Sequence, residues 1–234
     1  MSKFTYITTG MSIEKCHLGR NLILAVFGAG ATIVMSNAVG EVDPILRFYC
    51  EKARAACADR SPYEKAVSYS FTTTTYLKKL GSRGKNTSVD STVSDLYFSA
   101  GSLDSQRTVS TTSGGGSPID FSYPKVFESD YRFNFFPNDT GGKYLAIGFD
   151  TDSANDLRPV GLAIIDRAEY YLHRLYLFYP NHKQYKRFSR TFHFIERDGY
   201  IFPDSICEIA AKAGIFSTDY YRRETVIRNI RVRY

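Results

Sequence analysis

A long series of short segments, rich in aromatic and β-branched residues, most constrains what this chain can fold into. The series begins near Ala66 and continues to the C-terminus, and turn-forming Gly, Asn, Asp and Pro residues separate its members. Because 18 Tyr and 17 Phe residues accompany many Thr and Val residues, the composition favours strands over helices. The expected strands cover residues 66–80, 88–100, 103–112, 130–136, 143–150, 160–166, 170–179, 188–197, 200–211, 215–220 and 223–234.

The short turns between successive strands predict antiparallel pairing. The clearest turn is Asp198-Gly199, a dipeptide that favours a two-residue hairpin loop. Val226, Asn229 and Arg231 break the alternation of the last strand, so the sequence leaves its register open. A sheet of about nine to eleven strands must curl or close to avoid long exposed edges. The predicted fold class is therefore mainly β, with an open, strongly curved antiparallel sheet that forms an incomplete barrel.

One helix is expected before the strands. Residues 42–59 carry an apolar stripe at helical spacing, with Asp43 placed to cap the first turn and Pro44 inside it. We expect this helix to cover the concave face of the sheet. The sequence shows no internal repeat and no second domain, so residues 39–234 are predicted to form a single half-barrel domain.

Residues 1–38 have the character of a cleavable signal peptide. The uncharged apolar run from Leu22 to Met35 follows basic residues and is short for a membrane span, which needs about 20 apolar residues. Small residues in Ser36-Asn37-Ala38 predict cleavage after Ala38, and Met11 is an alternative start. An uncleaved anchor and a buried helix are the alternative interpretations. The prediction is export, as a soluble protein after cleavage or membrane-anchored without it.

The four cysteines leave two alternatives open. Cys16 is removed with the signal peptide, and Cys50 and Cys57 are two helical turns apart, too far to bond each other. Cys207 could pair with either of them in an oxidising compartment. Alternatively, the three cysteines remain as buried thiols.

Patterns that would indicate catalysis, a cofactor or a metal are weak. Residues 84–87 (GKNT) lack the upstream glycine of a phosphate-binding loop, and the acidic run at 150–156 lacks the glycine and the final Glu of a calcium loop. His173, His182 and His193 form no zinc-binding pair. The net charge of +6 includes no dense Lys/Arg run, which argues against nucleic-acid binding. We therefore predict a non-enzymatic protein without a cofactor or metal.

The apolar residues of the central strands are candidates for a ligand cavity. A curved sheet with a single helix over it would have difficulty filling its interior, and a remaining apolar cavity would suit an acyl chain. Most of these side chains would form the core in any case. The candidate lining residues are Phe133, Phe135, Leu145, Ile147, Phe149, Leu175, Leu177, Phe192 and Phe194.

The order of motifs in the C-terminal half resembles the LolA-like superfamily of periplasmic lipoprotein-sorting and lipid-carrier proteins. Residues 161–166 (GLAIID) are similar to that family's strand ending in aspartate, and 172–180 follow after a short connector. Residues 192–194 (FHF) and 197–203 (RDGYIFP) are similar to its later strand and aspartate-glycine signature. The resemblance spans residues 42–234.

This resemblance implies an incomplete antiparallel barrel with helices plugging its mouth, and acyl-chain binding without catalysis. The expected function is a periplasmic carrier or binder of lipid or lipid-modified protein, acting as a monomer. The alternative is a cell-envelope interaction or stress-sensor protein on the same scaffold, without lipid transfer. One clear helix is predicted here, whereas the lipoprotein carriers have several.

Overall fold

The structure is a computed structural model, in which one helix precedes ten strands within the described residues. The described residues are 43–65, 67–81, 86–100, 102–112, 121, 125–127, 131–135, 142–151, 154, 158–213 and 218–233. The elements are α2 (Pro44–Arg60), β1 (Ser68–Leu80), β2 (Asn86–Ser99), β3 (Ser102–Thr111), β4 (Arg132–Phe135), β5 (Tyr144–Asp150), β6 (Val160–Asp166), β7 (Leu172–Phe178), β8 (Arg187–Arg197), β9 (Tyr200–Ala213) and β10 (Thr218–Arg233).

Several sequence predictions concern residues outside the described part of the chain. The chain divides into two units, and all described residues belong to the second, Gly40–Tyr234. The predicted signal peptide with Cys16 lies outside the described residues, as do Gly84, Lys85, Asp152, Asn155 and Asp156. Among the residues that are described, no helix is long and apolar enough to cross a membrane.

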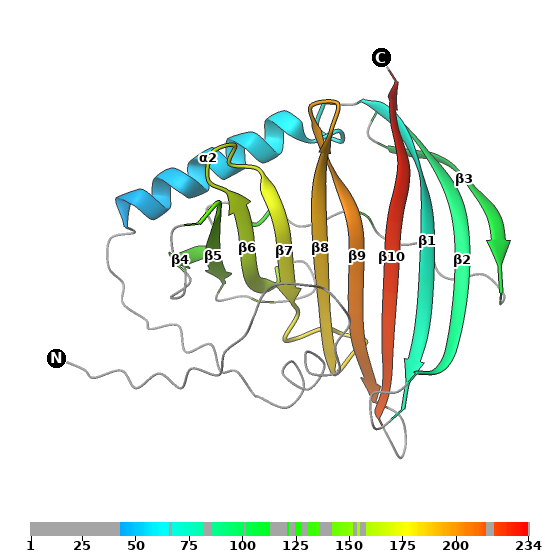
Figure 1. Ribbon diagram of the computed structural model, residues 1–234. Coiled ribbons are helices and arrows are strands. Elements are labelled where there is room, and N and C mark those ends of the chain that lie inside the picture. The colour runs from blue at the N-terminus through cyan, green and yellow to red at the C-terminus, as the bar shows by residue number, and fades with distance from the viewer. Residues whose placement is uncertain are drawn as a thin grey trace. The chain divides into compact units, whose positions relative to one another are not determined.

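Helix α2 begins where the sequence predicts. The Asp43 carboxylate accepts a hydrogen bond from the backbone N–H of Ile45 at 2.8 Å, and Pro44 occupies the first turn, where its missing N–H costs nothing. The helix ends at Arg60, after which Ser61 takes an extended conformation. Figure 1 shows α2 running across one face of the sheet.

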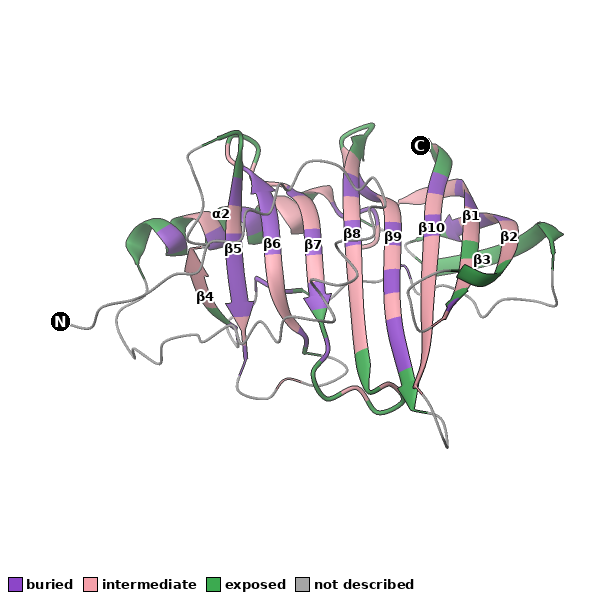
Figure 2. Cartoon of the chain, turned by 60° about the horizontal axis from the view of Figure 1, so that its bottom comes forward, coloured by how far each residue is buried: buried purple, intermediate pink, exposed green. Residues whose placement is uncertain are grey.

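All ten strands form one antiparallel sheet in the order β3-β2-β1-β10-β9-β8-β7-β6-β5-β4. The strands from β4 to β10 are neighbours in chain order, but β1 pairs with β10 at the other end of the chain. In the described part of the chain, the edge strands β3 and β4 do not pair with each other, so the sheet is open and curved as predicted (Figure 1). Strand β3 is exposed along its whole length (Figure 2).

Strand β10 differs from the sequence prediction. The structure has one strand, Thr218–Arg233, where the sequence predicts two strands at 215–220 and 223–234. Asn229 adopts a φ of 55°, and the pairing of β10 with β1 shifts in register beside it, between Ser70 and Thr72. A bulge of this kind changes which face the following side chains occupy. It explains why the alternation of this segment is irregular in the sequence.

Two rows of side chains define the inner face, which is the face of the sheet that packs against α2. Residues directly opposite each other in antiparallel strands point to the same face. One row runs from β4 to β2 through Phe135, Ile147, Ala163, Leu175, Phe192, Ile206, Thr225, Thr75 and Thr92. The next row runs through Phe133, Phe149, Gly161, Leu177, Arg190, Glu208 and Arg223. In the second row the side chains change from apolar to charged between β7 and β8, whereas the first row stays apolar as far as Ile206 of β9. Elsewhere on this face, Ile227, Phe71 and Leu96 extend the apolar surface to β10, β1 and β2.

Candidate functional site

The nine predicted lining residues all lie on the apolar part of the inner face. They join one hydrophobic cluster with side chains of α2. Seven of them are at most 2% exposed, while Phe133 and Phe135 on the short edge strand β4 are partly buried. The structure thus brings the predicted residues together, and their contact with a ligand remains a prediction.

Helix α2 covers this cluster with few large side chains. Its buried residues are Leu46, Cys50 and Ala53, of which only Leu46 is a large aliphatic residue. Near the middle of the helix, the Arg54 Nε donates a hydrogen bond to the backbone oxygen of Phe127 at 2.8 Å. Most of the large apolar side chains of the cluster therefore come from the strands, and α2 adds few of them.

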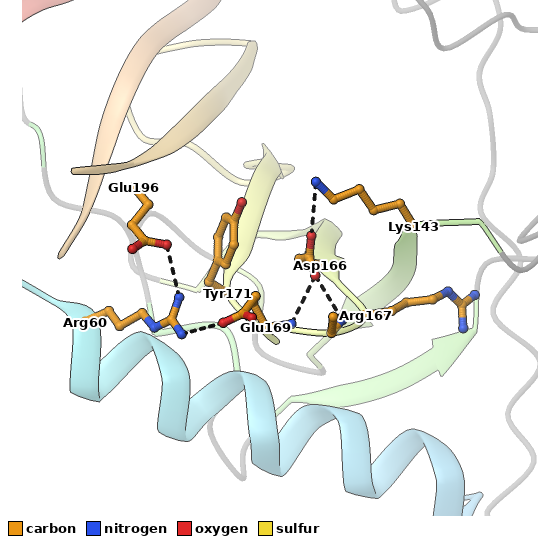
Figure 3. A pocket seen from close by; sticks show the side chains of 8 residues that line it. Arg60, Lys143, Asp166, Arg167, Glu169, Tyr171 and Glu196 are labelled. Atoms are coloured by element: carbon orange, nitrogen blue, oxygen red, sulfur yellow. Dashed lines mark hydrogen bonds and ion pairs between the residues drawn. The ribbon is translucent and has the colours of Figure 1, made fainter. Parts of the chain in front are cut away.

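A polar cleft lies at the C-terminal end of α2, where the helix meets the β6–β7 turn (Figure 3). Its volume is about 570 Å³, and its lining residues are Arg60, Lys143, Asp166, Arg167, Ala168, Glu169, Tyr171 and Glu196. Arg60 joins α2 to the sheet through ion pairs with Glu169 at 2.8 Å and Glu196 at 3.3 Å. The Arg60 guanidinium also lies over the Tyr171 ring, 5.8 Å from its centroid.

Asp166 holds the turn that forms one wall of the cleft. Its carboxylate accepts hydrogen bonds from the backbone N–H groups of Ala168 at 2.9 Å and Glu169 at 3.0 Å. Burial acts to raise the pKa of Asp166, but these two bonds and the charge of Lys143 outweigh it, so this pKa lies below its usual value. Asp166 is the strand-ending aspartate that the family resemblance identified.

A buried ion-pair network on the inner face was not predicted from the sequence. Glu208 is buried, and its carboxylate accepts from Arg190 Nε at 2.6 Å and from Arg223 Nη1 at 3.0 Å. The available signal was the alternation of β9, because Glu208 is two residues from the buried Ile206 and so points to the same face. This network ends the apolar run of the second row. Across the described residues, no group of three or more His, Cys, Asp or Glu side chains could hold a metal ion.

The cysteines occupy opposite faces of the sheet. Cys50 belongs to the cluster under α2, whereas Cys207 is next to the inward-facing Ile206 and therefore points outward. Cys50, Cys57 and Cys207 are all free thiols, so the disulfide considered for Cys207 with Cys50 or Cys57 is not formed. Burial raises the pKa values of the Cys50 and Cys57 thiols to about 12, which keeps both in the unreactive thiol form.

We expect His193 to make the free energy of unfolding decrease as the pH falls. It faces Arg174 on the outer side of β7 and β8, and burial together with the charges of Arg174 and His173 lowers the pKa of His193 to about 4. Between about pH 6.5 and about pH 4, the unfolded chain takes up a proton at this position that the folded protein does not. The contribution of His193 to the free energy of unfolding should therefore fall as the pH falls through this window.

Urea unfolding at about pH 7 and about pH 4.5 measures this loss. We expect His193→Gln to lose less stability between the two pH values than the unsubstituted protein. His182→Gln, in the connection between β7 and β8, removes a different histidine and is the control. Equal losses in all three proteins would contradict the assignment to His193.

The chain is similar to solved structures but not to any family model or curated protein. No protein-family model and no curated protein matches the sequence. Among solved structures, the chain is similar to a LolA superfamily protein from Nitrosomonas europaea, with 10% identity over 81% of this chain and 94% of that chain and a TM-score of 0.36. It is also similar to a domain described as an outer membrane lipoprotein-sorting protein from Vibrio parahaemolyticus, with 13% identity, coverage of 80% and 91%, and a TM-score of 0.39.

Proposed function

We propose that this chain binds one lipid acyl chain non-covalently on the apolar part of its inner face, beneath α2. In this proposal it is a monomeric carrier or binder of lipid or lipid-modified protein in the periplasm, reached through the predicted signal peptide, and it performs no catalysis. The observation that carries the proposal is the continuous apolar surface from β4 to β8, which α2 covers with few large side chains.

The shape of the apolar surface suits an extended chain. In the first row, five apolar side chains from Phe135 to Phe192 follow one another across five neighbouring strands. The second row ends at the Arg190, Glu208 and Arg223 network, which limits how far an apolar ligand can extend. Each buried methylene of an acyl chain contributes about 0.8 kcal/mol of binding free energy.

Entry of a ligand requires α2 to move aside, which withdraws the buried Leu46, Cys50 and Ala53 from the cluster and breaks the hydrogen bond of Arg54 to Phe127. Exposing Leu46 alone costs roughly 2 kcal/mol, and the bound acyl chain must offset this loss by covering the sheet side chains that the helix leaves, at about 0.8 kcal/mol per buried methylene. The ion pairs of Arg60 involve carboxylates that are about half exposed, and such pairs are worth about 0.2–1 kcal/mol each.

A second candidate function is an envelope interaction protein with a filled interior. The observation that favours it is the near-complete burial of seven of the nine predicted lining residues by the protein's own side chains. In that case the interior serves as core only, and partners bind elsewhere on the surface.

Native mass spectrometry of protein purified from its own cell envelope distinguishes the two candidates. We expect an added mass equal to one acyl lipid per chain. After removal of the lipid, the protein should enhance the fluorescence of a long-chain fatty acid that carries an environment-sensitive fluorophore. A protein that carries no lipid and leaves the probe unchanged would support the interaction function.

The role of α2 is tested by the rate at which the delipidated protein takes up the same probe. Arg60→Ala removes both ion pairs that join the helix to the sheet, and we expect it to accelerate uptake about two- to tenfold. Arg47→Ala is the matched control, because Arg47 pairs only with Glu51 of the same helix among the ion pairs of the described residues. Equal rates for the two variants would contradict the proposed movement of α2.

A further inference from the structure

The polar cleft at the end of α2 separates its charges into two sides (Figure 3). On the side formed by α2, the β6–β7 turn and the end of β8, two carboxylates share the Arg60 guanidinium. The Glu169 and Glu196 side chains are 57% and 45% exposed, so both remain accessible from the cleft. With two acids and one base, this side of the cleft has an excess of one negative charge.

Lys143 supplies a cation on the opposite side of the cleft, next to Asp166. Arg167 also lines the cleft, but its guanidinium points away from the other side chains (Figure 3), and its Nε donates a hydrogen bond to the backbone oxygen of Tyr144 at 3.3 Å. Asp166 already accepts two backbone hydrogen bonds, and its ion pair with Lys143 is 3.6 Å long, beyond the length of a hydrogen bond. The Lys143 side chain is 66% exposed, so its ammonium group can turn toward an anion in the cleft.

Tyr171 connects the cleft to the apolar interior. Its side chain lines the cleft and also packs against the hydrophobic cluster beneath α2. Arg60, which lies over the Tyr171 ring, belongs to the helix that covers this cluster. A molecule with an apolar chain beneath α2 could therefore place a polar group in the cleft without crossing the sheet.

We infer that the cleft binds a zwitterionic lipid headgroup, one that carries a phosphate and a primary ammonium group as phosphoethanolamine does. The ammonium faces Glu169 and Glu196, and the phosphate faces Lys143. A cleft that presents an acidic side and a basic side selects a ligand with both charges over one with a phosphate alone, because the unmatched carboxylates repel a purely anionic group. This inference rests on the proposed acyl-chain function, which it narrows to a class of lipid.

The test is a comparison of two water-soluble, short-chain lipids, a phosphatidylethanolamine and a phosphatidylglycerol, by isothermal titration calorimetry on the delipidated full chain. We expect the phosphatidylethanolamine to bind more tightly. The double variant Glu169→Gln, Glu196→Gln should weaken it about three- to tenfold and leave the phosphatidylglycerol equal or tighter. Lys143→Gln should weaken both lipids, since both carry a phosphate. The matched control is Glu51→Gln, at an exposed carboxylate of α2 outside the cleft.

Glycerophosphoethanolamine, which has the headgroup without acyl chains, separates this inference from the proposed function. Weak binding of this compound that the double variant abolishes supports the headgroup site, even if no acyl lipid binds. Equal affinity for the two lipids in the unsubstituted protein and in the double variant would overturn the headgroup site and leave acyl binding intact. Binding of the phosphatidylglycerol to the double variant also verifies that the variant is folded.

Discussion

Substitution of Phe192 by alanine is expected to lower the free energy of unfolding by about 3–5 kcal/mol. Phe192 is fully buried, lies between Leu175 and Ile206 on the inner face, and has its ring stacked against Phe194 with centroids 5.9 Å apart. Truncation removes the transfer free energy of the ring and leaves a cavity that the neighbouring strands cannot fill. Urea denaturation monitored by circular dichroism measures the loss.

Phe178→Ala is the matched control for this experiment. Phe178 ends the neighbouring strand β7, points to the outer face and is 42% exposed, so its truncation should cost less than about 1 kcal/mol. A similarly small loss for Phe192→Ala would mean that the ring lines an open cavity. Such a result would contradict the complete burial of this ring.

A methyl group added at Gly161 is expected to destabilise the protein by about 3 kcal/mol. A Cβ atom at this position would lie 1.8 Å from the backbone oxygen of Tyr176 and 2.9 Å from the Phe149 ring. The first contact involves backbone of the paired strand β7, so Gly161→Ala must push β6 and β7 apart rather than turn a side chain. The measurement is again the free energy of unfolding in urea.

Gly142→Ala is the control for added volume, because a Cβ atom at Gly142 would meet no atom within 4 Å. We expect its free energy of unfolding to stay within about 0.5 kcal/mol of the unsubstituted value. Equal stability of Gly161→Ala and Gly142→Ala would show that β6 and β7 tolerate separation at this position.

Local features of the fold follow from the sequence. Asp198 and Gly199 adopt φ values of 53° and 81° in the hairpin between β8 and β9, as the Asp-Gly dipeptide predicts. The capped start of α2, most strands and the open antiparallel sheet were predicted for the same reason. Each depends on backbone preferences and on side-chain alternation within a few residues.

Features that depend on distant segments could not be predicted in this way. Nothing in the residues of β1 indicates that its partner is β10, because the two strands are separated by nearly the whole domain and their pairing depends on the order of all the strands. The outward position of Cys207, which rules out its contact with Cys50 in this structure, depends on the same arrangement.

The same distinction between local and long-range features applies to the candidate site. The alternation of apolar residues within one strand already predicts that Leu145, Ile147 and Phe149 share a face. That this face meets α2, that Glu208 pairs with Arg190 and Arg223 on it, and that Arg60 reaches Glu169 and Glu196 to form a cleft could be seen only in the folded chain. Alternation involves residues that are neighbours in one strand. A cleft or an ion pair joins side chains that are far apart in the sequence, and only the folded sheet brings them within a few ångströms of one another.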